Sequence, residues 1–159
     1  LRKKGLTKAE KKGDRETREG LIESYVHSNR IGVIVEVNCE TDFVARLPEF
    51  KEFAHQIAMQ IAAMNPKFPT LEDVPADVVE AKKAELLASD SLKGKPADMA
   101  EKIVEGQIKK HFAEQVLAEQ AYILDDSMTV GEFIKEEIAR RGENIRVSQF
   151  KRIELGVTE

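Results

Sequence analysis

The stretch IGVIVEV, residues 31–37, decides the fold, because apolar side chains occupy every second position. These alternating residues are Ile31, Val33, Val35 and Val37. A period of two residues is typical of a β-strand with one buried face. Residues 21–27 and residues 30–37 form two strand-like runs around Ser28-Asn29. Asn tolerates positive φ, so Ser28-Asn29 is predicted to form the tight turn of a β-hairpin.

Downstream of this hairpin the apolar period changes to that of a helix. Pro48 pre-sets the first turn, and Asn65-Pro66 ends the pattern. Between them, apolar side chains recur at steps of three and four residues: Phe50, Phe53, Ala54, Ile57, Ala58, Ile61 and Met64. We expect this helix to cover the sheet.

The second half of the chain predicts three more helices and a closing strand. One helix is expected over residues 75–88, and a longer one from Pro96 to Val116, with a loop at residues 89–95 between them. Residues 121–127 are expected to be irregular. Thr129 with Glu132 predicts a capping box that opens the last helix, and Gly142 predicts its end.

Residues 145–155 suggest the closing strand, with a bulge between Val147 and Phe150, where the alternation slips. The predicted class is therefore α+β: a small antiparallel sheet, made of the hairpin and the C-terminal strand, covered by helices. Residues 1–19 lack a helical apolar stripe and are interpreted as a basic linker. Residues 20–159 are interpreted as the core domain.

Charge and composition limit the possible functions. Residues 1–20 carry eight Lys or Arg and four acids, whereas the whole chain has a net charge of −4. An acidic body disfavours a dedicated nucleic-acid binder. No run approaches the roughly 20 apolar residues of a membrane span. Cys39, the only cysteine, is expected to pack rather than react, and a single thiol forms no internal disulfide.

Motifs of catalytic or metal sites are absent from the sequence. The histidines at 27, 55 and 111 do not share the spacing of metal ligands on one helix face, and no glycine-rich phosphate loop follows a strand. We therefore predict a protein that is not an enzyme and that has no cofactor and no metal.

Asp42 and Phe43 are the strongest candidates for a binding site. They lie on the short connection between the strand and the helix that begins at Pro48. A Phe beside a carboxylate on such a turn suits a wedge, whose ring enters an apolar crevice of a partner while the acid perturbs a neighbouring polar network. In the alternative, the ring folds back and covers the end of the sheet.

The sequence TDFVA, residues 41–45, preceded by VEVNCE, residues 35–40, resembles the signature of elongation factor Ts, the nucleotide exchange factor of the GTPase elongation factor Tu. Further blocks resemble the same family in the same order: residues 24–33, 55–63, 93–96, 101–106 and 142–146. The last block is similar to cyanobacterial and plastid members. Residues 1–6 resemble the end of the family's N-terminal helical domain, most of which is absent from this sequence.

The resemblance implies a guanine nucleotide exchange factor that binds elongation factor Tu, GDP-bound and nucleotide-free, and promotes GDP release during translation elongation. By this resemblance Asp42 and Phe43 enter the GTPase near its magnesium, and Thr41 and Val44 shape the turn. His27 matches a histidine that contacts another domain of the partner; alternatively it is an ordinary surface residue.

The short members of the family act as dimers, so a homodimer is expected in which one subunit presents Asp42-Phe43 and the other presents His27. The expected location is the bacterial cytoplasm or the plastid stroma, without a membrane role. A second reading is a ribosome-associated binding module that uses residues 1–20 on RNA.

Overall fold

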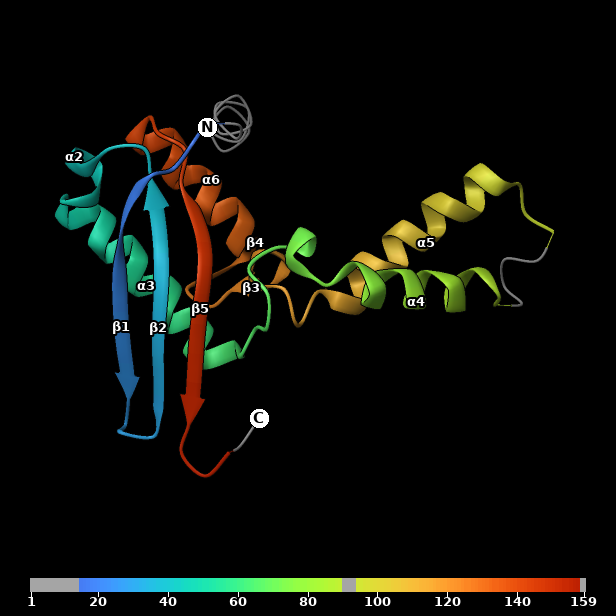
Figure 1. The fold of residues 1–159 in the computed structure, drawn as a ribbon, viewed down its shortest axis with the longest axis horizontal. Coiled ribbons are helices and arrows are strands. Elements are labelled where there is room, and N and C mark those ends of the chain that lie inside the picture. The colour runs from blue at the N-terminus through green and yellow to red at the C-terminus, as the bar shows by residue number, and fades with distance from the viewer. Residues whose placement is uncertain (1–14, 90–93, 158–159) are drawn as a thin grey trace.

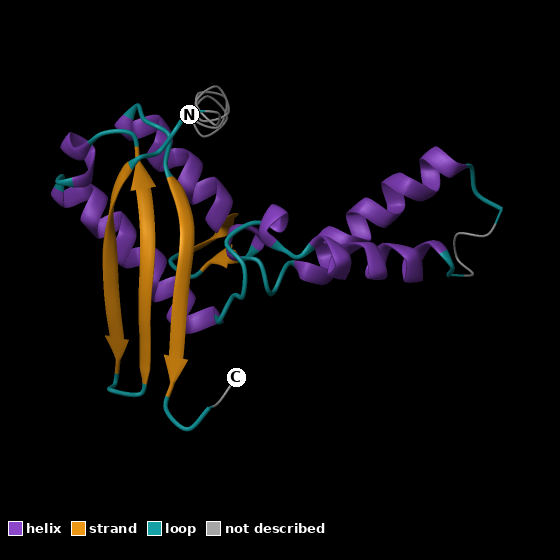
Figure 2. Ribbon diagram, viewed as in Figure 1, coloured by secondary structure: helices purple, strands orange, loops and turns teal. Residues whose placement is uncertain are grey.

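The chain, described here by a computed structural model over residues 15–89 and 94–157, is built on a three-stranded antiparallel sheet. Strands β1 (Glu19–His27), β2 (Ile31–Cys39) and β5 (Arg146–Glu154) form it, with β2 in the centre (Figures 1 and 2). The predicted hairpin, closing strand and α+β class are confirmed. Residues 1–14 of the expected linker lie outside the described residues, so the boundary at residue 19 stays a prediction.

The hairpin turn has the backbone conformation that its residues favour. Ser28 and Asn29 have φ angles of 52° and 57°, and the N–H of Arg30 donates to the carbonyl of His27 at 2.9 Å. Two successive residues at positive φ are the mark of a type I′ turn, whose twist matches that of the flanking strands. The prediction of a turn at Ser28-Asn29 is confirmed.

The predicted bulge lies in β5 at Ser148. Glu36 pairs with Gln149, and the next pair on β2 joins Val37 to Val147, so Ser148 has no opposite residue of its own. The extra residue reverses the alternation of β5. As a result, Val147 and Phe150 both face the core.

Helices α3 (Pro48–Met64) and α6 (Val130–Arg141) cover one face of the sheet (Figure 1). α3 begins at Pro48 and ends at Asn65, which has a φ of 49°, as the sequence predicts. The expected capping box of α6 is present, and Gly142 ends that helix with a φ of 74°. Local signals therefore fix the ends of both helices.

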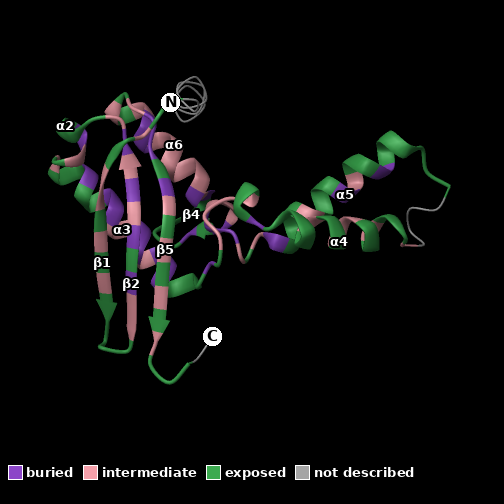
Figure 3. Ribbon diagram, in the orientation of Figure 1, coloured by how far each residue is buried: buried purple, intermediate pink, exposed green. Residues whose placement is uncertain are grey.

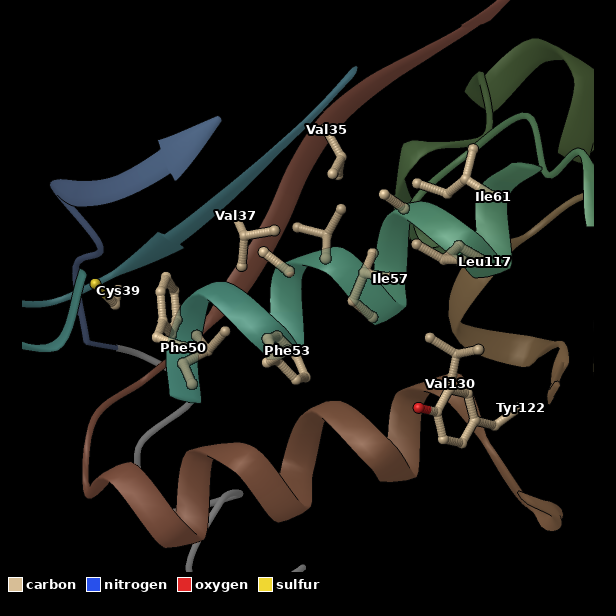
Figure 4. Packing of buried hydrophobic residues seen from close by; sticks show 14 of the residues in the cluster. Val35, Val37, Cys39, Phe50, Phe53, Ile57, Ile61, Leu117, Tyr122 and Val130 are labelled. Carbon is tan, nitrogen blue, oxygen red and sulfur yellow. The ribbon is translucent and has the colours of Figure 1, made fainter. Parts of the chain in front are cut away.

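The main core lies between these helices and the sheet (Figure 4). β2 contributes one face, and α3 contributes the side chains that were predicted from its stripe, except Met64, which is exposed. The largest fully buried side chains of the core are Phe50, Ile57, Ile61, Leu117, Val33, Val35, Val37 and Val130.

The opposite face of the sheet is open. Figure 3 shows this face toward the viewer, with no described helix in front of it. Four branched apolar side chains share it by strand register and are 55 to 74% exposed: Ile22, Val26, Ile34 and Ile153. An apolar cluster of this kind on a sheet usually marks a contact surface.

An antiparallel helical arm extends from the sheet domain (Figure 1). It consists of α4 (Ala76–Leu87), within the helix predicted over 75–88, and α5 (Ala97–Phe112). The prediction that the second helix continues to Val116 is wrong. The chain leaves the helix after Phe112 because residues 115–118 bond to residues 67–69; for example, Leu117 N–H donates to the carbonyl of Phe68 at 2.8 Å.

A second correction concerns residues 121–127, which were expected to be irregular. They contribute to a small hairpin of β3 (Ala121–Tyr122) and β4 (Asp125–Thr129), joined through the pairs Ala121 with Thr129 and Tyr122 with Asp125. Strands this short carry too few residues to show a period, and Asp125-Asp126 gives β4 a turn-like composition.

Candidate partner-binding site

The connection after β2 is a single helical turn, α2 (Asp42–Ala45), rather than an irregular link. Thr41 is its N-cap, with extended backbone angles, and the Thr41 Oγ1 accepts a hydrogen bond from the N–H of Val44 at 3.4 Å. Asp42 occupies the first turn, where a negative charge is favourable. The signature residues therefore form a capped, ordered turn.

Phe43 projects from this turn into solvent. Its side chain is 73% exposed, so the ring does not fold back over the end of the sheet. Fully burying a Phe is favourable by about 1.5–3 kcal/mol, and this chain forgoes most of that gain. The ring is therefore accessible from solvent.

Asp42 presents its carboxylate beside the ring. Its nearest described cation is Arg46 on the next turn, whose Nη2 lies 3.4 Å from the Asp42 Oδ2; both side chains are mostly exposed. An exposed pair of this kind contributes about 0–1 kcal/mol, so Arg46 is held only weakly against Asp42.

Val44 differs from Asp42 and Phe43 because it is only 4% exposed and belongs to the main core. Thr41 and Val44 thus lie where they can shape the turn. Cys39, beneath them, is buried, and its Sγ donates to the carbonyl of Thr41 at 3.2 Å. Burial raises the pKa of the Cys39 thiol to about 11, with a smaller effect from the charge of Glu143, so Cys39 packs as a neutral group.

Sequence reasoning missed the residues that hold this turn from outside. Glu143, in the loop after α6, accepts hydrogen bonds from the backbone N–H groups of Glu40 and Thr41. These contacts join segments about a hundred positions apart, and no spacing in the sequence predicts such a pair. The only signal was that Glu143 falls in one of the blocks that resemble the family.

His27 lies at the other end of β1, beside the hairpin turn, and is exposed. The Tyr25 hydroxyl lies 2.8 Å from its Nδ1. Both residues line a cavity of about 520 Å³ between the sheet and the end of α3, whose other walls include Met59, Ile123 and Arg152. The structure thus places His27 at a mostly apolar depression.

The structure does not bring His27 and Phe43 together. β2 connects the two places along its full nine residues, and at about 3.3 Å per residue they lie roughly 26 Å apart. Figure 1 shows α2 and the hairpin turn at opposite ends of the sheet. His27 and Phe43 therefore lie at two separate places on the described chain.

Two negative observations concern the described residues 15–89 and 94–157. No group of three or more His, Cys, Asp or Glu side chains there could hold a metal ion. None of the helices in that part of the chain is long and apolar enough to cross a membrane.

Comparisons with known proteins agree on one family. Residues 8–157 match the family model described as "Elongation factor TS". The chain is 53% identical over 159 residues to elongation factor Ts of Fervidobacterium nodosum, covering 98% of this chain and 80% of that protein. It is 55% identical over 157 residues to elongation factor Ts of Thermotoga maritima, covering 98% and 78% respectively.

A chloroplast protein is similar to the same extent. Elongation factor Ts, chloroplastic, of Rhodomonas salina is 52% identical over 159 residues, which cover 98% of this chain and 72% of the relative. Bacterial and plastid relatives therefore match along almost the whole of this chain.

Proposed function

The chain belongs to the elongation factor Ts family, and we propose on that premise that it is a guanine nucleotide exchange factor that binds elongation factor Tu·GDP and promotes GDP release. Its role is in translation elongation. The observation that carries the proposal is the outward ring of Phe43 beside the exposed carboxylate of Asp42, on a turn whose base is buried.

The proposed mechanism is a coupling between two binding equilibria. Phe43 enters an apolar crevice of the GTPase, and Asp42 displaces groups that hold the magnesium ion and the phosphates. A factor that binds the nucleotide-free GTPase more tightly than the GDP form must weaken GDP binding by the same ratio. No covalent step is required, so the protein acts as a binding factor and not as an enzyme.

The Val44 side chain fixes the turn that carries Asp42 and Phe43 to the main core. Because it is buried in the main core, the turn cannot retreat when a partner presses on the ring. An anchor that is ordered before binding loses less entropy on association.

We also propose a homodimer that forms through the open face of the sheet. Its exposed apolar side chains, Ile22, Val26, Ile34 and Ile153, suit a second copy of the same face, since a two-fold interface places like surfaces together. The distance between His27 and Phe43 suits a division of labour, in which one subunit presents the wedge and the other presents His27 to a different domain of the partner.

The remaining expectations follow from the same premise. We place the protein in the bacterial cytoplasm or the plastid stroma, since its relatives include bacterial and chloroplast proteins. Contact of the basic leader, residues 1–20, with ribosomal RNA stays a secondary prediction, and residues 1–14 of that leader lie outside the described residues.

The decisive experiment is stopped-flow release of a fluorescent GDP analogue from elongation factor Tu. We expect the parent chain to accelerate release. Phe43→Ala should reduce the acceleration about 30-fold, the factor that corresponds to a hot-spot loss of ~2 kcal/mol. Asp42→Ala should reduce it substantially as well.

Matched controls come from the β3–β4 hairpin. Leu124→Ala removes another exposed apolar side chain from a turn, and Asp126→Asn removes another exposed carboxylate; both should leave release unchanged. If Asp42→Ala and Phe43→Ala accelerate release as well as the parent, the wedge assignment is wrong. If the parent itself has no effect, the exchange function is wrong.

A further inference from the structure

We propose that Glu143 is a positioning residue for nucleotide exchange, whose carboxylate fixes the loop that presents Asp42 and Phe43. The inference rests on the proposed exchange function of that motif, and it assigns a role to a residue about a hundred positions away along the chain.

Three donors on the loop converge on the Glu143 carboxylate. Its Oε1 accepts from the backbone N–H of Glu40 at 3.1 Å and from that of Thr41 at 3.0 Å. Its Oε2 accepts from the hydroxyl of Thr41 at 2.6 Å. Hydrogen bonds to an ionised acceptor are roughly twice as strong as neutral ones.

The two loops also bond in the reverse direction. The Glu40 Oε2 accepts from the backbone N–H of Asn144 at 2.5 Å and lies 3.5 Å from the Arg15 guanidinium. The Asn144 side-chain amide donates to the carbonyl of Arg15 at 2.8 Å. Residues 40–41 and 143–144 are thus joined by reciprocal contacts on both sides.

The Thr41 hydroxyl links these contacts between the two loops to Asp42 and Phe43 on α2. Because its proton points to Glu143, its oxygen keeps a lone pair for the N–H of Val44, at 3.4 Å. The carboxylate therefore orients the cap of α2, and α2 carries Asp42 and Phe43. If the Thr41 side chain rotated so that its oxygen pointed away from the Val44 N–H, it would no longer cap α2.

Without the Glu143 carboxylate, the N–H groups of Glu40 and Thr41 would bond only to water, and the Thr41 hydroxyl would no longer be held in the position that caps α2. The turn would then spend part of its time in geometries that do not fit the partner, and a binding-competent state that is only partly populated lowers apparent affinity in proportion. The main core does not depend on these bonds, since each of the three ends on the loop and none on α3 or on the sheet face.

The first test measures the loop itself by amide hydrogen exchange. In Glu143→Ala, the amides of Glu40 and Thr41 should exchange at least about 10-fold faster than in the parent, because hydrogen bonds to charged groups count ≈ 1.5–3 kcal/mol. Glu143→Gln should fall between the two, since its amide oxygen still accepts from the backbone. Unchanged protection in Glu143→Ala would overturn the proposal.

The second test measures GDP release from elongation factor Tu with intact chains. Glu143→Ala should lower the rate at subsaturating factor by at least about 10-fold, because the loss of even one charge-assisted bond, at ~1.5 kcal/mol, corresponds to that factor. Glu143→Gln should recover part of the rate. Glu114→Ala, which removes an exposed carboxylate from the loop after α5, is the charge-matched control and should match the parent.

A combined variant separates positioning from general destabilisation. In the Asp42→Ala, Phe43→Ala background, Glu143→Ala should cause no further loss, because it acts only through those two side chains. An equal fold-loss in both backgrounds would overturn the proposal. If Glu143→Ala does not fold, Glu143→Gln provides the same comparison.

The outcomes also distinguish the two hypotheses. A parent chain that does not accelerate release overturns the exchange function, while amide protection still decides whether Glu143 holds the loop. A parent that accelerates release, together with a Glu143→Ala variant of equal activity, overturns the positioning role alone.

Discussion

Phe43 and Val44 are neighbours in the chain with opposite surroundings. One side chain is 73% exposed and the other is 4% exposed. A helical turn rotates each residue by about 100° from the last, so a single turn is enough to separate a solvent-facing side chain from a core-facing one. The buried valine serves as the base on which the ring is held outward.

The burial of Cys39 predicts how slowly its thiol reacts. Its thiol is buried and has a pKa of about 11, so at pH 8 only about a thousandth of it is the reactive thiolate. We expect a thiol reagent such as dithiobis(nitrobenzoate) to react slowly with the folded chain and rapidly in concentrated urea. Rapid reaction of the folded chain, followed by absorbance, would contradict the assignment of Cys39 as a packing residue.

Among the elements, α6 carries a buried acid that makes stability depend on pH. Glu137 is 6% exposed, and its Oε2 lies 3.4 Å from the Nε of Arg141, although neither atom forms a hydrogen bond with the described part of the chain. Burial raises the pKa of Glu137 above its ordinary 4.5, and the charges of Arg141 and Arg140 offset part of that effect.

The number of protons bound in each state decides whether the chain becomes more or less stable as pH rises. Between pH 4.5 and the raised pKa, the folded chain keeps the Glu137 proton while the unfolded chain has lost it, so the free energy of unfolding falls as pH rises through this window. We expect Glu137→Gln to remove that part of the slope. Urea unfolding of both chains over a pH series measures it, with Glu114→Gln as the exposed control; parallel curves for parent and Glu137→Gln would contradict the prediction.

The elements that the sequence predicted well are those defined by neighbouring residues. The alternation in β2, the capping box at Thr129 and the stop at Gly142 all depend on residues within a few positions. The β3–β4 hairpin and the end of α5 were not predicted, because pairing with distant segments decides them. The same reason hid the contact of Glu143 with Thr41.

At the scale of the whole molecule, the sheet is a single layer with helices on one side and apolar residues on the other. A change on the open face therefore tests assembly without touching the main core. Ile34 is the best position, because it lies on the central strand and its side chain is 55% exposed.

We expect the parent to sediment as a dimer and Ile34→Asp to sediment as a monomer, since a carboxylate at the centre of an apolar interface would be desolvated without a partner. Leu124→Asp, on the β3–β4 hairpin, is the matched control and should stay dimeric. A parent that sediments as a monomer and still exchanges nucleotide would refute the shared presentation of Phe43 and His27.

The position of β2 has a consequence for how the protein is made. Its neighbour on one side, β1, precedes it immediately, but its other neighbour is β5, so pairs such as Ile31 with Glu154 close only after the intervening residues exist. A nascent chain therefore carries β2 with an unpaired edge throughout the synthesis of the helices and the arm. Contacts of such long sequence separation slow folding and expose strand edges to aggregation, so this is the interval in which the edge of β2 is open to pairing with another chain.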